Sequence, residues 1–255
     1  MGAKSTRGRR TTDLSVGDGT GGGVDLISGL SDDLLVRILE LLPDARDAVR
    51  THALSRRWRG LWTGVAALRF EFNSRPKKFP GADDGAAERY VAFVNDALAL
   101  RAAAKESAVK DLAISFDMLY EPKAEGLAPP FVQAAQGWIR YGLQHVAKSV
   151  SFRMELPWRY LDDMNKTIEL SSSAKLETMH IKVPAGSGVG GGHLVSSVCC
   201  PSLRKLRLVY LQFSTTMMEE PLLIEAGALL ELSIDTIFEL QFLELRTPAL
   251  RSLHI

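Results

Sequence analysis

The chain has 255 residues, of which 46% are hydrophobic and 24% charged, and its formal net charge is +1. This composition is typical of a globular protein with one or two domains, and the charge gives no overall attraction to nucleic acid or to an anionic membrane. The two cysteines are adjacent, which excludes a disulfide framework and a cysteine metal site. We therefore expect a reducing compartment, the cytoplasm or the nucleus, and no apolar run is long enough to span a membrane.

The first 23 residues are basic and then rich in glycine, which predicts a disordered tail. Its first six residues fit the pattern for N-myristoylation, and a plain flexible tail is the alternative interpretation. Gly17, Gly19 and Gly22 also fit G-x-G-x-x-G, but no strand precedes them, which excludes a dinucleotide site.

Residues 24–70 contain the most regular pattern of the chain. Ser31 is a good N-cap and two acidic residues follow it, so a helix is expected to begin here. Pro43 has no amide donor and is expected to end that helix. A second helical run is expected at residues 47–62, with tryptophans four residues apart. The apolar stripe of the first helix consists of Leu34, Leu35, Ile38, Leu39 and Leu42.

This stretch resembles the F-box of plant proteins. One position departs from the family, which usually has Leu-Pro where this chain has Leu30-Ser31. The matching residues are Leu30, Asp32, Asp33, Leu34, Leu35, Ile38, Leu39, Leu42, Pro43, Asp47, Ala48, Val49, Arg50, Ala53, Leu54, Ser55, Arg56, Arg57, Trp58, Leu61 and Trp62.

The resemblance implies docking on a Skp-type adaptor protein, which joins the chain to a cullin–RING ubiquitin ligase. A segment this short seldom buries a sufficient core alone, which agrees with a partner, and an internal core helix is the alternative. Four of these residues are expected to serve both the docking face and the chain's own core: Leu54, Trp58, Leu61 and Trp62. The expected docking residues are Leu30, Leu34, Leu35, Ile38, Leu39, Leu42, Pro43, Leu54, Trp58, Leu61 and Trp62.

A linker rich in Pro, Lys and Gly is expected at residues 71–85. Beyond it, apolar periodicity predicts helices at 86–104 and 131–146. Alternation predicts short strands at 109–116, 149–154, 178–183, 205–210, 231–235 and 251–255.

The strands share the template apolar-x-x-apolar-x-apolar of leucine-rich repeats. In a chain rich in Leu, Val and Ile, chance alone gives some matches to this template. The prediction of repeats therefore depends on the regular spacing of the units, which start at residues 147, 176, 203, 229 and 250. The last two units also share an upstream pair, Leu222-x-Ile224 in one and Leu243-x-Leu245 in the other. Segments 200–208 and 247–255 resemble the leucine-rich repeats that follow F-boxes in plant proteins.

The predicted fold is therefore α/β, with a helical F-box at residues 24–70 and a leucine-rich-repeat solenoid at 86–255. Short parallel strands with helices or loops between them would bury one continuous core. The chain ends on a strand without a polar cap, so the repeat domain is expected to be incomplete. Outward positions of the strands form a concave face that suits an extended target, and its candidate residues are His180, Arg207, Ser233 and His254.

No arrangement of residues indicates catalysis, a metal or a cofactor. The five histidines are dispersed, and the second G-x-G-x-x-G match, at residues 186–191, is interpreted as a loop between repeats. Cys199 and Cys200 are expected to be small buried side chains. A DNA-reading helix is an alternative for the arginines of residues 46–59, but Asp44 and Asp47 offset them, so nucleic acid is not an expected partner.

Two functions follow from the resemblance. The first is a substrate-recognition adaptor of an SCF-type (Skp–cullin–F-box) E3 ubiquitin ligase, a non-catalytic subunit whose repeats bind a target protein. The second is a non-ligase leucine-rich scaffold, or a truncated decoy that binds the Skp adaptor without delivering a substrate. The identity of the target is not indicated by any motif.

Overall fold

The computed structural model describes residues 26–73, 85–104, 108–118, 128–155, 173, 175–182, 197–209, 222–235 and 242–255. The chain divides into two compact units, Met1–Ser31 and Asp32–Ile255. In the first unit, the amide of Leu30 donates to the carbonyl of Ile27 at 3.1 Å and closes a turn. The predicted tail and the glycine motif at 186–191 lie outside the described residues.

The second unit begins with a helical segment, residues 32–64. Its first helix starts directly after Ser31, as expected, and ends at Glu40 before Pro43, with a tight turn in which the Leu41 amide donates to the Ile38 carbonyl at 3.1 Å. Its elements are α1 (Asp32–Glu40), α2 (Ala45–Arg50) and the 3₁₀ helices η1 (Thr51–Ala53), η2 (Arg57–Arg59) and η3 (Leu61–Gly64).

The single second helix expected at residues 47–62 is wrong, because α2 has only six residues. At its end, the Thr51 hydroxyl donates to the Ala48 carbonyl at 2.7 Å, and the His52 ring bonds the Val49 carbonyl at 2.7 Å. These side chains occupy carbonyls that the next helical turn needs, so the chain continues as 3₁₀ turns.

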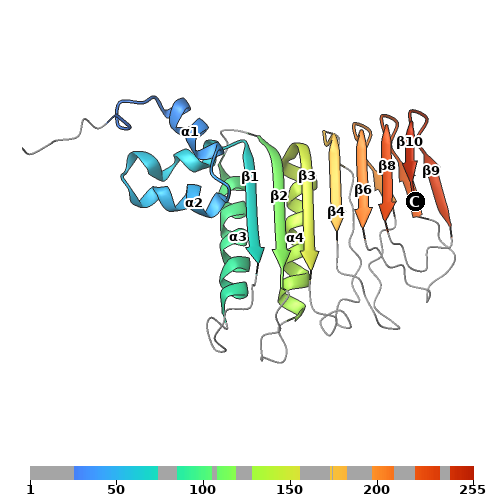
Figure 1. Cartoon of the computed structure of the whole chain (residues 1–255), viewed down its shortest axis with the longest axis horizontal. Coiled ribbons are helices and arrows are strands. Elements are labelled where there is room, and N and C mark those ends of the chain that lie inside the picture. The colour runs from blue at the N-terminus through green and yellow to red at the C-terminus, as the bar shows by residue number, and fades with distance from the viewer. Residues whose placement is uncertain are drawn as a thin grey trace, which may run out of the picture. The chain divides into compact units, whose positions relative to one another are not determined.

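Most strands join one parallel sheet of seven strands in the order β1-β2-β3-β4-β6-β8-β10 (Figure 1). A second parallel sheet has the order β5-β7-β9. The strands of the large sheet are β1 (Ala67–Asn73), β2 (Val109–Asp117), β3 (Val146–Glu155), β4 (Thr178–Lys182), β6 (Lys205–Val209), β8 (Glu231–Asp235) and β10 (Ser252–His254). Those of the small sheet are β5 (Ser197–Cys199), β7 (Leu222–Glu225) and β9 (Leu243–Arg246).

Strand β1 corrects the predicted boundary between F-box and linker. It starts inside the stretch assigned to the F-box and continues to Asn73, so residues 71–73 belong to the sheet and not to a linker. The cause is the alternation of Leu68, Phe70 and Phe72, which places apolar side chains on the same face.

The repeat template predicted from the sequence is in register across the large sheet. Two apolar rows cross it, one through Leu206 and Leu232 and the other through Leu208 and Ile234. The upstream pairs of the last two units are also in register, in the small sheet, where Leu222 lies opposite Leu243. The first row is Leu68, Leu112, Val150, Met179, Leu206, Leu232 and Leu253, and the second is Phe70, Ile114, Phe152, Ile181, Leu208 and Ile234.

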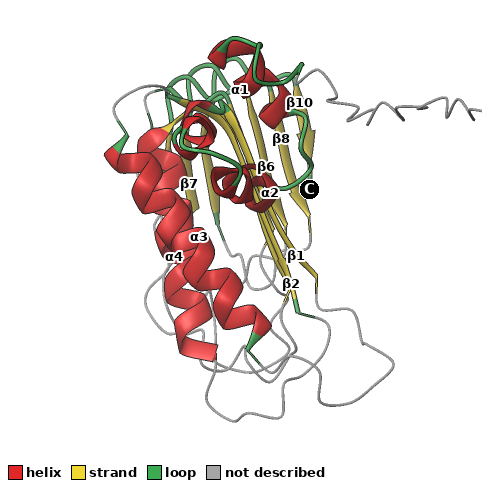
Figure 2. Cartoon of the chain, turned by 90° about the vertical axis from the view of Figure 1, so that its left-hand side faces the viewer, coloured by secondary structure: helices red, strands yellow, loops and turns green. Residues whose placement is uncertain are grey.

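Helices α3 (Ala86–Ala103) and α4 (Ala128–His145) cover one face of the large sheet at β1–β3 (Figure 2). An aromatic cluster fills the interface, with Tyr90 and Phe131 at 5.7 and 5.3 Å from Phe116, measured between ring centroids. Gly142 lets α4 approach β3, because a Cβ there would lie 3.0 Å from a methyl group of Val150. Figure 2 shows β7 on the same side of the sheet, so the opposite face is left free of both layers.

We expect Leu232→Ala to lower the free energy of unfolding by about 2–5 kcal/mol, because Leu232 is fully buried in the first row. Leu253 occupies the same row in the last strand and is 46% exposed, so Leu253→Ala should cost roughly 1 kcal/mol or less. Urea unfolding of the two variants measures the difference. Equal losses would show that the row does not carry the core.

Candidate functional site

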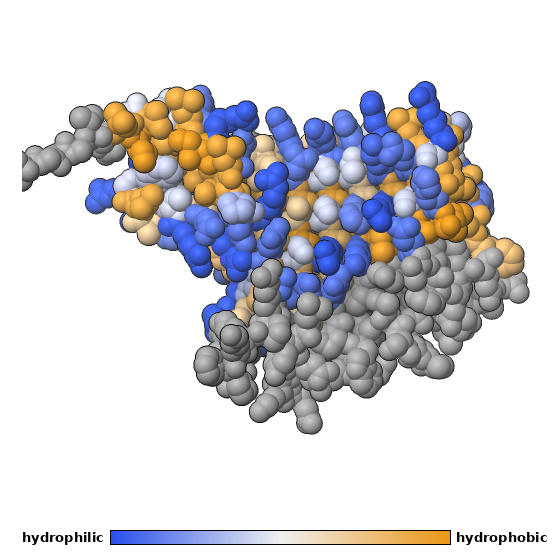
Figure 3. All heavy atoms as spheres, in the orientation of Figure 1, coloured by the Kyte–Doolittle hydropathy of each residue, from blue (hydrophilic) through white to orange (hydrophobic). Residues whose placement is uncertain are grey.

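The apolar stripe of α1 divides into two faces. Leu34, Ile38 and Leu41, spaced i, i+4 and i+7, are 52%, 42% and 83% exposed. We call these three residues the α1 apolar stripe. Figure 3 shows apolar surface gathered over this part of the chain. Such a row of large exposed apolar side chains is typical of a protein-docking surface.

The other face of α1 belongs to the core of the chain. Leu35 and Leu39 are buried, at 0% and 3% exposure, and so are Leu61 and Trp62. Leu35 and Leu39 were expected to dock, but an additional protein cannot reach them without opening the helical segment. Leu54 is 67% exposed in the turn after η1, whereas Trp58 is half-buried. Of the remaining predicted residues, Leu30 and Leu42 are half-buried and Pro43 is exposed.

Leu41 was missed in the sequence. Its i+7 spacing from Leu34 indicates that the two residues lie on the same side. The pattern was overlooked because Leu35 and Leu39 form a second apolar stripe beside it. Both stripes have the period of a helix, and the pattern alone does not say which one faces the core.

An open groove of about 640 Å³ lies between α1 and the 3₁₀ helices η2 and η3. Arg57 lines the groove, and its guanidinium lies 2.8 Å from the carboxylate of Asp32. The two walls pack closely where a Cβ on Gly64 would lie 3.1 Å from a methyl group of Val36. The lining residues are Asp32, Asp33, Val36, Arg37, Arg57, Gly60, Leu61, Thr63 and Gly64.

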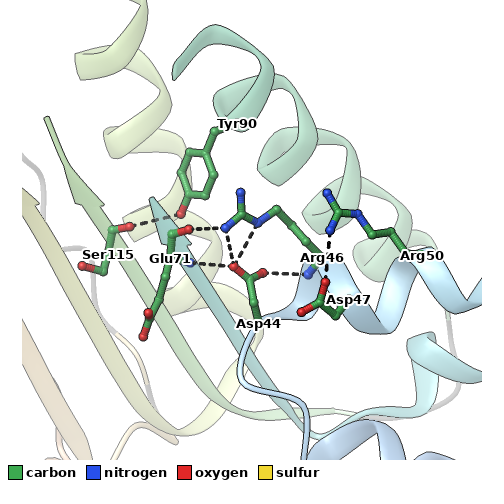
Figure 4. A network of polar contacts seen from close by, with 7 residues as sticks. All are labelled: Asp44, Arg46, Asp47, Arg50, Glu71, Tyr90 and Ser115. Atoms are coloured by element: carbon green, nitrogen blue, oxygen red, sulfur yellow. Dashed lines mark hydrogen bonds and ion pairs between the residues drawn. The ribbon is translucent and has the colours of Figure 1, made fainter. Parts of the chain in front are cut away.

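Asp44 and Arg46 connect the helical segment to the large sheet (Figure 4). Asp44 caps α2 by accepting from the Arg46 amide at 2.7 Å, and its other carboxylate oxygen accepts from Nε and Nη2 of Arg46 at 2.9 and 2.7 Å. Nη2 also donates to the carbonyl of Glu71 in β1 at 2.6 Å, and the Glu71 amide donates back to Asp44 at 3.4 Å. We call Asp44, Arg46 and Glu71 the latch.

The latch extends to α3 through Tyr90. The guanidinium carbon of Arg46 lies 5.5 Å from the centre of the Tyr90 ring, within range of a cation–π interaction. The Tyr90 hydroxyl donates to the Ser115 carbonyl at 3.3 Å. The hydrogen bond to Asp44 raises the pKa of Arg46, and burial raises the pKa of Tyr90. Both groups therefore keep their protons, and the latch remains charged at physiological pH.

The arginines considered as a DNA-reading cluster are largely engaged with carboxylates. Arg46 pairs with Asp44, and Arg50 pairs with Asp47 at 3.1 Å. Arg57 belongs to the ion pair across the groove. Three of the five arginines of residues 46–59 are thus paired with nearby carboxylates.

The four residues proposed for target binding form one row across the free face of the large sheet. His180 lies opposite Arg207, Arg207 opposite Ser233, and Ser233 opposite His254. Burial lowers the pKa of His180, and the nearby cations Arg207 and Lys182 lower it further. The register thus brings together residues that are far apart in the sequence.

Asp117 and Glu155 lie opposite each other at the ends of β2 and β3. Hydrogen bonds from Lys182 and Arg153 lower the pKa of Glu155. Burial raises the pKa of Asp117, and the charge of Glu155 raises it further. Asp117 is only 9% exposed, and its Oδ1 has no hydrogen-bond partner among the described residues.

Within the described ranges, no group of three or more His, Cys, Asp or Glu side chains is placed to hold a metal ion. In the same part of the chain, no helix is long and apolar enough to cross a membrane. Cys200 is buried and forms no disulfide bond, as expected of a small core residue.

We expect Arg46→Ala to lower the free energy of unfolding by about 1–3 kcal/mol, because it removes the latch and leaves Asp44 without its partner. Arg50→Ala is the matched control, since its ion pair is exposed and should contribute less than about 0.5 kcal/mol. Denaturant unfolding compares the two. A larger loss in Arg50→Ala would contradict the role assigned to the latch.

Asp117→Asn should raise stability at pH 7. A raised pKa means that the folded chain binds the proton more tightly than the unfolded chain, so the ionised carboxylate opposes folding. The gain should shrink as the pH falls toward the ordinary aspartate pKa of about 3.9, where the native side chain also becomes neutral. Asp111→Asn, in the same strand, is the control. A variant that is less stable than the native chain at pH 7 would contradict the burial cost.

No family model matches the chain, and no solved structure matches it significantly. Three of its relatives are proteins of Arabidopsis thaliana. A putative FBD-associated F-box protein is 29% identical over 238 residues, which cover 91% of this chain and 49% of the relative. A second one is 57% identical over 47 residues, which cover 18% of this chain and 10% of that protein. An F-box/FBD/LRR-repeat protein is 47% identical over 60 residues, which cover 24% and 12%.

The chain thus spans about half the length of the first of these relatives. All three are named as F-box proteins, and the third is also named as an LRR-repeat protein. The chain is thus similar to plant F-box proteins, some of which have leucine-rich repeats, and the resemblance predicted from its sequence is confirmed.

Proposed function

We propose that the chain is a substrate-recognition subunit of an SCF-type ubiquitin ligase. In this proposal the helical segment is the F-box and docks on a Skp-type adaptor, and the large sheet binds the target protein. The observation that carries the proposal is the α1 apolar stripe, exposed in a chain whose relatives are F-box proteins.

The α1 apolar stripe has the form expected of a helix that inserts into a partner's apolar groove. Leu34 and Ile38 lie one turn apart on one side of α1, and Leu41 follows in the turn after the helix. Leu54 is a further exposed apolar residue of the same segment and is a second candidate contact. Leu35, Leu39, Leu61 and Trp62 support this surface from beneath, because their burial fixes the orientation of α1.

The chain needs no catalytic group for this role. A recognition subunit acts by holding a target close to the enzyme that modifies it, which raises the effective concentration of the reacting groups. The latch supports such a role, since it joins the docking helices to β1 through hydrogen bonds and not through a flexible linker. We further propose that the chain acts in the cytoplasm or the nucleus, because its two adjacent cysteines do not form the disulfide framework that is typical of oxidising compartments.

Leu34→Asp combined with Ile38→Asp should abolish co-purification with a Skp-type adaptor, because it places two charges in the apolar contact. Both residues are exposed, so the fold should be retained, in contrast to substitution of the buried Leu35. Arg37→Asp is the matched control: it changes the net charge by the same amount on the same helix, and the Arg37 side chain is 79% exposed.

Co-purification from plant cells with the proteasome inhibited, together with a melting curve for each variant, measures these effects. Full-strength adaptor binding by the double variant would contradict the assignment of the stripe. Adaptor binding by the native chain without any captured target would favour the decoy, and no adaptor binding would favour a scaffold outside the ligase.

A further inference from the structure

The free face of the large sheet carries a concentration of positive charge at its centre. From Ser149 to the end of β3, and along β4 and β6, the outward positions hold four cations and one carboxylate, Glu155. Figure 3 shows hydrophilic residues over much of this face, with more apolar surface between them. We call its cations the basic stripe; they are Arg153, Lys182, Lys205 and Arg207.

Carboxylates border the basic stripe on both sides. Asp111 and Asp117 occupy outward positions of β2, and Glu231 and Asp235 occupy those of β8. The stripe is therefore confined to three neighbouring strands, which span about 10 Å between the outer two at the usual strand spacing. That width accommodates one extended chain.

Every cation of the stripe has a carboxylate partner. Arg153 and Lys182 share Glu155, which is half-buried. Arg207 lies 2.9 Å from Asp235, and both side chains are exposed to solvent, at 58% and 40%. Lys205 pairs with Glu231 at 2.9 Å with similar exposure. Because exposed ion pairs contribute little to stability, an anionic ligand can replace the carboxylates of these last two pairs at low cost.

Short polar side chains lie at the centre of the stripe. His180 lies between Ser151 and Arg207 in the register, and Ser149 lies one row away beside Thr178. The two serines and Thr178 are shorter than the cations that surround them. Because burial and the neighbouring cations lower the pKa of His180, its ring is neutral at physiological pH and adds a hydrogen-bonding group.

We propose that the basic stripe binds an extended acidic segment of the target protein. This rests on the proposed function in that the segment belongs to the protein delivered for ubiquitination. A nucleic acid fits less well, because the bordering carboxylates repel a phosphate backbone wider than the stripe. The outward positions of the described strands also lack Phe, Tyr and Trp, on which unpaired bases stack.

The test uses the whole chain and a fluorescent peptide of alternating Glu and Ser, with an alternating Lys and Ser peptide and a thymidine oligonucleotide as comparison probes. Fluorescence anisotropy at about 0.1 M salt measures binding, since this salt still permits contacts over about 10 Å. We expect the acidic peptide to bind and the basic peptide not to bind.

Two variants should move the affinity in opposite directions. Arg207→Glu should weaken binding of the acidic peptide by about tenfold or more, because it replaces an attraction with a repulsion. Asp235→Asn should strengthen it by about two- to fivefold, because it removes the internal competitor for Arg207. Arg204→Glu, which lies in the turn before β6, makes the same charge change outside the stripe and should have less than about a twofold effect.

Three outcomes would overturn the inference: no binding of the acidic peptide, equal losses in Arg207→Glu and Arg204→Glu, or weaker binding in Asp235→Asn. Tighter binding of the oligonucleotide, lost in Arg207→Glu, would reassign the stripe to nucleic acid. The gain expected for Asp235→Asn cannot result from misfolding, so the inference stays testable if Arg207→Glu is unstable. Adaptor co-purification is measured on the same samples. Adaptor binding without peptide binding would contradict this inference alone, whereas loss of adaptor binding by the native chain would contradict the proposed function.

Discussion

The in-register stacking of two apolar rows is the constraint on which the rest of this structure depends. Each strand of the large sheet from β1 to β8 contributes one residue to each row, and β10 contributes Leu253 to the first row. Successive side chains of a strand point to opposite faces. A slip of one residue in any strand would therefore turn its apolar pair toward solvent and its polar residues into the core. The same register also fixes the free face, so the neighbours of His180 and Arg207 are determined by the packing of Met179 and Leu206 behind them.

The latch makes the helical segment a continuation of this stack. Asp44 has two roles, since it caps α2 and also holds Arg46 against the backbone of β1. Two further contacts strengthen the junction: the carboxylate of Glu40 accepts from the Ala66 amide at 3.2 Å, and Arg101 of α3 donates to the Val65 carbonyl at 2.9 Å. The α1 apolar stripe and the free face thus belong to one compact unit, and a partner on one surface is held at a defined distance from a partner on the other.

Much of this arrangement could be predicted from the sequence, because the apolar template repeats at strand spacing and the register follows from it. The strand of residues 231–235 is confirmed for this reason. Leu222 and Leu243, which hold the same position in the two similar units, lie opposite each other in the small sheet. The predictions failed in two situations: where two apolar stripes have the same helical period, and where a local hydrogen bond ends a helix early. The stripe of α1 gave no indication that Leu35 faces inward and Leu41 outward, and the Thr51 hydroxyl ended α2 early. The latch joins residues 27 positions apart, which no local pattern reveals.

The central claim is that the chain docks through its helical segment and keeps the sheet available for a target. Hydrogen–deuterium exchange of the whole chain, with and without a Skp-type adaptor, tests this most directly because it locates contact along the backbone. We expect the adaptor to slow exchange in α1 and in the turn that contains Leu54, and to leave exchange in β4 and β6 unchanged. Slower exchange in β4 and β6 with no change in α1 would contradict the claim.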